Sequence, residues 1–143
     1  MKVASFNHQG RDSYGVVNAD GIVDVGRELG GKYASLRHIL AAGALDELAA
    51  AAAGKSADAG FDDVSHLPVI GDPAKIICVG LNYDDHRKEG GAQEVDNPTL
   101  FTRFANSQIG HGQAIIAPRV SDKVDYEAEL AVIIGRRGRH IGK

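Results

Sequence analysis

Residues 125–135 (DYEAELAVIIG) form an apolar stretch that opens with two glutamates two positions apart. Side chains of a β-strand alternate between two faces, so Glu127 and Glu129 would share one face. From Leu130 onward both faces are apolar, which is typical of a strand buried on both sides. Two carboxylates at the entry to such a strand cannot both stay ionised without a positive neighbour. The pattern therefore predicts a cation bound between them.

The spacing of this pair favours a hard divalent ion. Cα atoms at positions i and i+2 of a strand lie roughly 6.5 Å apart, and two flexible glutamate side chains can converge on Mg²⁺ with bonds of about 2.1 Å. Oxygen donors alone favour Mg²⁺, Mn²⁺ or Ca²⁺ over Zn²⁺. For an isolated E-x-E pair the commoner alternative is a solvated sheet face, where both glutamates point into water.

Length and charge restrict the class of protein. A chain of 143 residues suffices for one domain, or for a small module and part of another. A formal charge of -3 gives no electrostatic footprint for nucleic acid. No apolar run is long enough to span a bilayer, the start lacks the apolar core of a signal peptide, and the single Cys78 cannot form an internal disulfide. We therefore expect a soluble cytoplasmic protein with no nucleic-acid or membrane partner.

The first 70 residues predict a small module of strands and helices. Three short β-favouring runs within residues 1–27 indicate a meander, and Asp20-Gly21 is a strong hairpin signal. Helical spacing begins after Ser35, and a second helix is predicted from Ala44 to about Ala53. The proline-flanked segment at residues 67–73 suits a connector between modules. We expect domains at 1–70 and 71–143.

The second part begins with a predicted buried strand, residues 75–80, that leads into a polar loop. In this loop His86 and Glu89 stand three apart, so on one helical turn they would face each other. A carboxylate beside an imidazole orients the ring and raises its basicity, as a water-activating general base needs. The alternative for an isolated H-x-x-E is a surface ion pair.

Two further strands are predicted before the glutamate pair, at residues 100–104 and 114–118. Arg103 lies in the first of these, where its guanidinium can clamp a carboxylate in bidentate fashion. An arginine on an edge strand is the equally weighted alternative. His111, set between two glycines, is predicted to be a loop residue rather than a ligand.

The order of these parts resembles the fumarylacetoacetate hydrolase family. The resemblance rests on a Gly-Leu-Asn-Tyr turn ending the strand at residues 75–80, His86-x-x-Glu89, Asn97-Pro98 and the run at residues 125–135. It covers about residues 67–135, and the leading segment is similar to the small N-terminal module of many bacterial members. The resemblance implies an α+β, β-rich fold in which a β-meander/helix module precedes the first part of a mixed β-roll.

The resemblance also implies a chemistry and roles for individual residues. Glu127 and Glu129 become ligands of Mg²⁺ (or Mn²⁺ or Ca²⁺), and His86 and Glu89 become the catalytic dyad. The expected function is metal-dependent hydrolysis of a C–C bond in a small-molecule 2-oxo acid or 1,3-dicarbonyl substrate, by a homodimer. Many relatives carry lysine where this chain has Arg103, which bears on its predicted substrate-binding role.

The sequence departs from the family pattern at its end. No aspartate follows Asp125, so the third metal ligand of the family has no counterpart, and the resemblance implies that the rest of the roll is missing. We therefore expect this chain alone to show little or no turnover. The alternatives are an isomerase, hydratase or decarboxylase of the same family, and a non-catalytic β-rich binding or dimerisation module.

Overall fold

The computed structural model describes residues 1–93 and 95–142. They form two compact units, residues 1–70 together with 109–143, and residues 71–108. Each unit is described by itself below. The fold is α+β and rich in sheet, as the sequence predicted.

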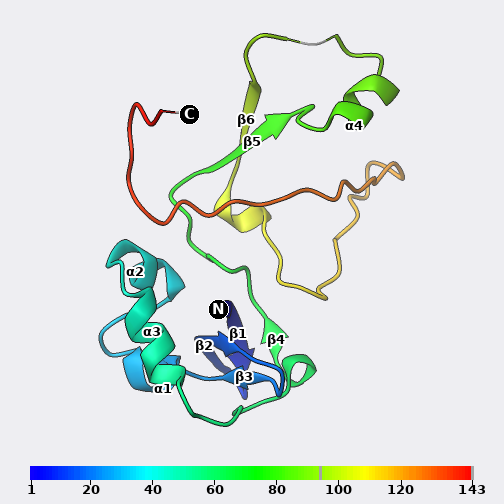
Figure 1. Cartoon of the computed structure of the whole chain (residues 1–143). Coiled ribbons are helices and arrows are strands. Elements are labelled where there is room, and N and C mark those ends of the chain that lie inside the picture. The colour runs from blue at the N-terminus through cyan, green and yellow to red at the C-terminus, as the bar shows by residue number, and fades with distance from the viewer. Residues whose placement is uncertain (94, 143) are drawn as a thin grey trace. The chain divides into compact units, whose positions relative to one another are not determined.

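The first unit is built on an antiparallel four-stranded sheet of order β3-β2-β1-β4 (Figure 1). The strands are β1 (Lys2–His8), β2 (Arg11–Val17), β3 (Ile22–Val23) and β4 (Ser65–His66). Gln9 and Gly10 join β1 to β2 with φ of 53° and 80°, the left-handed pair that a tight hairpin requires. At the next turn the Asn18 side-chain oxygen accepts hydrogen bonds from the amides of Asp20 and Gly21. The predicted meander is therefore confirmed.

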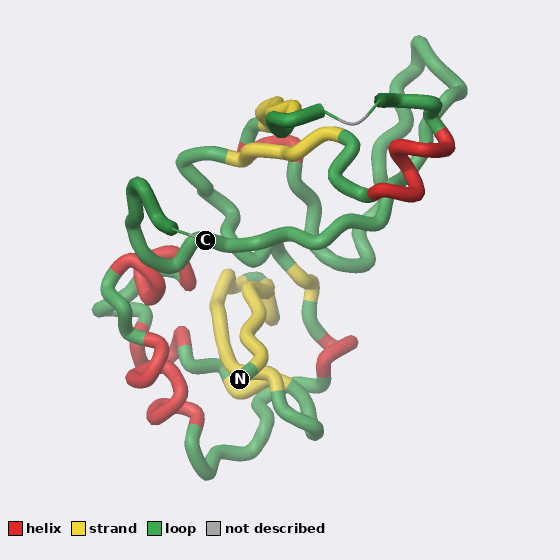
Figure 2. The backbone as a smooth tube through the Cα atoms, turned by 45° about the horizontal axis from the view of Figure 1, so that its top comes forward, coloured by secondary structure: helices red, strands yellow, loops and turns green. Residues whose placement is uncertain are grey.

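The α-helices of this unit lie together on one side of its sheet (Figure 2). They are α1 (Gly26–Leu29), α2 (Leu36–Ala41) and α3 (Leu45–Ala52). Ile39 and Leu48 are both 0% exposed and pack with Tyr14 and Val23 of the sheet. Burying each such aliphatic side chain stabilises the fold by about 1.5–3 kcal/mol. The helices predicted after Ser35 and Ala44 are confirmed, whereas the short α1 was not predicted.

The opposite face of the sheet carries a second apolar cluster. Ala4, Phe6 and Ile22 are buried there, with Val17 and Val64 packed against them. Strand alternation separates this set from the cluster beneath the helices, because successive residues of β1 and β2 point to opposite faces. The sheet is thus apolar on both sides.

A buried carboxylate joins the sheet to its first helix. The Asp24 side chain is 1% exposed and accepts hydrogen bonds from Ser13 Oγ, at 2.5 Å, and from Arg11. Arg27 Nε of α1 lies 3.2 Å from the same carboxylate. The Asp24 amide in turn donates to Asp58 at 2.8 Å, which ties the loop after α3 to the strand. The charge of Asp24 is therefore compensated by two guanidinium groups.

The second unit is a two-stranded ribbon with one short helix. Strand β5 (Ile76–Gly80) pairs antiparallel with β6 (Thr99–Arg103), and α4 (Asp84–Glu89) lies between them in sequence. A 3₁₀ turn at Ala105–Ser107 follows β6. Both strands were predicted, but the prediction that the first is buried is wrong, since Ile77 is 57% exposed. Two strands cannot bury both faces of a ribbon by themselves.

The strands predicted at residues 114–118 and 125–135 are not formed. Residues 109–142 contain no helix or strand, and Ile116, Leu130 and Ile134 are 92%, 82% and 78% exposed. A strand needs a neighbouring strand to pair its amides and carbonyls, and among the described residues no β-ladder includes this run. Within the described residues no helix is long and apolar enough to cross a membrane.

Candidate functional site

Helix α4 carries the predicted catalytic pair. His86 and Glu89 occupy positions i and i+3 of this helix, which are neighbours on its surface, and both side chains are exposed. The sequence had assigned this stretch to a polar loop, whereas the structure forms a helix over Asp84–Glu89. Their action as an acid–base dyad stays a prediction.

The charges of α4 follow the direction of its dipole. Asp84 and Asp85 lie in the first turn and Lys88 in the last. Asp84 contacts Lys88 Nζ and Arg87 Nη2, each at 2.5 Å. These hydrogen bonds, that from Lys88 first, hold the pKa of Asp84 below its ordinary value of 3.8. The helix that presents His86 is therefore stabilised by an ionised Asp84.

A strained residue precedes α4, and a side-chain hydrogen bond follows it. Leu81 enters the helix from β5 with φ 55°, a left-handed conformation that costs a non-glycine residue roughly 1–2 kcal/mol. At the other end Arg87 Nη1 donates to the Ala92 carbonyl at 3.1 Å. This bond occupies a carbonyl just beyond the helix and limits how the following loop departs.

Arg103 lies at the end of β6 and holds the turn that follows it. Its Nε donates to Ser107 Oγ at 3.2 Å and its Nη2 donates to the Ser107 carbonyl at 2.7 Å. A guanidinium has five N–H donors, so these two bonds leave others for a carboxylate. The substrate-clamping role of Arg103 stays a prediction, and its hydrogen bonds give it a structural role as well.

Glu127 and Glu129 lie in the extended segment after residue 109, not in a strand, and both are exposed. The premise that they enter a buried strand is therefore wrong here, and burial supplies no electrostatic reason for a cation. Within residues 1–93 and 95–142, no three His, Cys, Asp or Glu side chains gather into a group that could hold a metal ion. Two carboxylates are still the donor chemistry that Mg²⁺ prefers, with water completing its shell.

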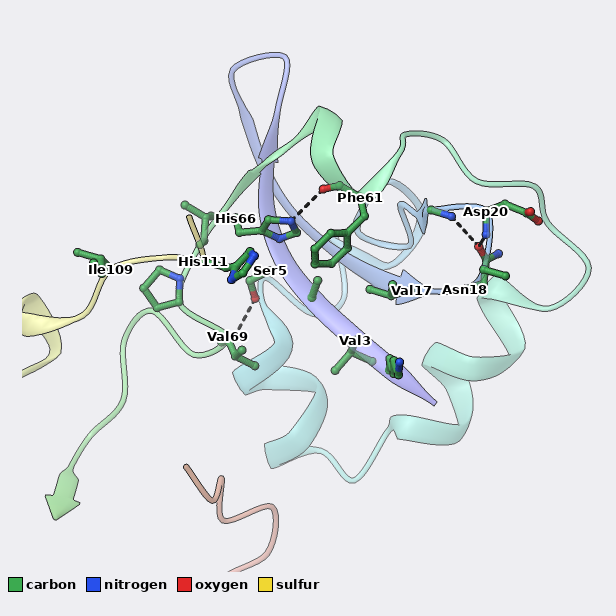
Figure 3. A pocket seen from close by; sticks show the side chains of 16 residues that line it. Val3, Ser5, Val17, Asn18, Asp20, Phe61, His66, Val69, Ile109 and His111 are labelled. Carbon is green, nitrogen blue, oxygen red and sulfur yellow. Dashed lines mark hydrogen bonds between the residues drawn. The ribbon is translucent and has the colours of Figure 1, made fainter. Parts of the chain in front are cut away.

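A cluster of rings that the sequence did not reveal lies in the first unit. His66, Phe61 and His111 contact one another on the wall of a pocket of about 770 Å³ (Figure 3). His111 does lie in a loop, as predicted, but that loop packs against β4. No local pattern could reveal the pairing, because the two histidines are far apart in sequence and meet only through tertiary contacts.

Comparison with known proteins finds a family model that matches the second half of the chain. Residues 75–143 match the family model described as fumarylacetoacetate (FAA) hydrolase, C-terminal. This stretch contains all of the predicted site residues: His86, Glu89, Arg103, Glu127 and Glu129.

Similar proteins include two mitochondrial oxaloacetate tautomerases. Fahd2a of Rattus norvegicus is 45% identical over 78 residues, which is 54% of this chain and 25% of that protein. FAHD2A of Homo sapiens is 42% identical over 79 residues, 55% of this chain and 25% of that protein. The matched stretch thus spans about a quarter of these relatives.

The fold of this chain is also similar to that of a protein of known structure. A protein from Mycobacterium smegmatis assigned as HpcE superposes with a TM-score of 0.62 and 28% sequence identity. The superposition covers 80% of this chain and 40% of that one. It therefore reaches beyond the stretch matched by the family model and includes part of the N-terminal unit.

Proposed function

Since this chain belongs to the fumarylacetoacetate hydrolase family, a family of enzymes, we propose that it contributes the acid–base helix and the carboxylate pair of a 2-oxo acid tautomerase. The substrate class is a small 2-oxo dicarboxylic acid of the oxaloacetate type. The observation that carries this proposal is the identity of 45% and 42% to oxaloacetate tautomerases over more than half of the chain. It replaces C–C hydrolysis, the first expectation from sequence, as the leading reaction.

Tautomerisation asks little of a protein beyond proton transfer and charge stabilisation. A proton leaves the carbon next to the ketone, an enolate develops, and the ketone oxygen takes up a proton, so that no bond between heavy atoms breaks. His86 with Glu89 on α4 supplies an imidazole and a carboxylate for these transfers. Arg103 supplies donors for a substrate carboxylate.

The carboxylates of Glu127 and Glu129 would hold the divalent ion, Mg²⁺ or its substitutes Mn²⁺ and Ca²⁺. When bound, such an ion stabilises negative charge on the oxygen of a 2-oxo acid. The donor chemistry of the pair fits this group, while the number of ligands supplied by the chain predicts weak binding.

Hydrolysis of a C–C bond is the second candidate, because the arrangement of α4 is compatible with it. An imidazole next to a carboxylate suits activation of water as well as it suits enolisation, so the dyad alone does not distinguish the two reactions. The substrate's fate does distinguish them, because hydrolysis yields two fragments and tautomerisation yields none.

The test follows deuterium in a 2-oxo acid by NMR. The chain is incubated in D₂O with Mg²⁺ and either oxaloacetate or an acylpyruvate, and exchange next to the ketone is compared with the rate in buffer. Because this chain alone should show little turnover, we expect only a small excess of exchange over the buffer rate, without fragments, and loss of that excess in His86→Ala. Fragments of the acylpyruvate without excess exchange would favour the hydrolase.

Metal dependence is tested separately by calorimetry. Titrating Mg²⁺ should give heat in the parent chain and in His86→Ala, but not in the double variant Glu127→Gln/Glu129→Gln. Heat that persists in the double variant would reject these two carboxylates as the ligands. Absence of heat in the parent chain would favour the binding-module alternative.

A further inference from the structure

The ring cluster in the first unit has the features of a metal site distinct from the glutamate pair. His66 is 9% exposed and lies on β4, and His111 lies on the loop that crosses this strand. Their ring centroids are 5.6 Å apart, and Phe61 packs on His66 with centroids 4.2 Å apart (Figure 3). Both histidines line the pocket, so a small ion from solvent can reach them.

One nitrogen of His66 is committed by a hydrogen bond. Its Nε2 lies 2.9 Å from the Phe61 carbonyl oxygen, and because a carbonyl can only accept, Nε2 carries the proton. Neutral imidazole then has its lone pair on Nδ1. Histidines that bind metals in proteins almost always donate their other N–H to a carbonyl or carboxylate in this way, which orients the ring.

The loop that carries His111 is held firmly against β4. A Cβ at Gly110 would lie 1.8 Å from the His66 carbonyl oxygen, so only glycine allows this approach. The Gly110 amide donates to Gln113 Oε1 at 2.9 Å, and Gln113 Nε2 donates to the His66 carbonyl at 3.4 Å. The backbone around His111 is therefore positioned by His66 itself.

The separation of the two rings suits one shared ion. With Zn–N bonds of about 2.0–2.1 Å, each imidazole centroid lies about 3.2 Å from the ion, and a tetrahedral angle separates the centroids by roughly 5.2 Å. The observed 5.6 Å is close to this distance, and the interplanar angle of 73° keeps the rings from stacking.

We propose that His66 and His111 form a two-imidazole site for a late first-row transition ion, with Zn²⁺ as the representative. Imidazole ligands favour Zn²⁺, Cu²⁺ and Ni²⁺, whereas Mg²⁺ and Ca²⁺ prefer oxygen. No third His, Cys, Asp or Glu joins the pair in the part of the chain that is described, so water fills the other positions. The proposal does not depend on the proposed function, because it uses different residues and a softer ion.

Zinc titration of the chain by calorimetry tests the site. We expect one equivalent of Zn²⁺ to bind, and His111→Gln and His66→Gln each to weaken the affinity by at least about tenfold. The matched control is His38→Gln, which alters an exposed histidine of α2 that contacts Ser35. The double variant Glu127→Gln/Glu129→Gln should bind Zn²⁺ as the parent chain does.

Imidazole NMR provides a readout that loss of folding cannot imitate. In the free chain we expect His66 in the Nε2-protonated form, and on adding Zn²⁺ the ring signals of His66 and His111 should move together. His111→Gln, which changes an exposed side chain, guards against misfolding of the His66 variant. Zinc heat that is unchanged in His111→Gln, or ring signals of His66 that do not respond to Zn²⁺, would overturn the proposal.

Discussion

The N-terminal sheet and residues 114–134 are both rich in apolar and β-branched residues, yet only the first forms strands. Phe6 and Ile22 are each 1% exposed in the sheet, whereas Leu130 and Ile134 are 82% and 78% exposed. Strands β1, β2 and β3 pair through short turns, whereas residues 114–134 form no strand pairing with any described segment. Apolar pattern is thus a requirement for a strand, and a pairing neighbour decides whether one forms.

The ribbon of the second unit lies between these two cases. Strands β5 and β6 pair over their full length, but Leu100 and Phe101 remain 58% and 52% exposed. The backbone groups that face the partner strand are hydrogen-bonded, while the side chains are not covered. Hydrogen bonding and burial are therefore separate requirements, and only the N-terminal sheet meets both.

Amide hydrogen exchange should show the largest contrast between the two regions. Amides paired between β1 and β2 should exchange at least about a thousandfold more slowly than the intrinsic rate, because they open only with the fold. Amides of residues 114–124 should exchange close to the intrinsic rate. Comparable protection in both regions, measured by NMR in D₂O, would contradict the contrast.

Truncation of matched leucines tests the same contrast by side-chain packing. Leu48→Ala should lower the free energy of unfolding by about 2–5 kcal/mol, since Leu48 is 0% exposed and truncation leaves a cavity. Leu130→Ala should change it by no more than about 0.5 kcal/mol. Urea unfolding measures both. A large loss in the free energy of unfolding of Leu130→Ala would mean that the Leu130 side chain is packed against other residues.

The Asp24 network offers a smaller effect within the sheet. Asp24→Asn removes the charge that faces Arg11 and Arg27, and we expect a loss of about 1–3 kcal/mol in the free energy of unfolding. Asp20→Asn changes an exposed turn residue and should be nearly neutral. If both variants lost the same free energy of unfolding, the buried carboxylate would contribute no more to stability than an exposed one.

The smallest effect is expected in α4 and depends on pH. The pKa of Asp84 is lowered by Lys88 and Arg87, so its contribution to the helix is fully present above its ordinary pKa of 3.8. The contribution is lost as pH falls through the lowered value. Chemical shifts of α4 followed by NMR should show the helix weakening in acid. In the Asp84→Asn variant, helix α4 should be less stable already at neutral pH, and its chemical shifts should not show this acid transition.

The candidate site was predictable where a local rule applies. The i, i+3 spacing indicated that His86 and Glu89 would be neighbours on any helical turn, although their stretch was assigned to a loop. β-favouring residues predicted the strand that carries Arg103. Both rules act within a few residues. Burial of the glutamate pair was predicted wrongly, since it depends on strands that must come from elsewhere. The contact between His66 and His111 was missed for the same reason.

The amino-acid sequence alone indicated the resemblance to the family, the strands and turns of the N-terminal meander and the helices after Ser35 and Ala44, since the local elements follow from residue types and short spacings. Tertiary structure alone decided that Asp24 is buried between two arginines and that a loop glycine brings His111 to His66. It also decided that residues 125–135 stay extended and exposed. The physical reason is that burial and pairing are properties of two segments at once, and a pattern in one segment cannot specify the other.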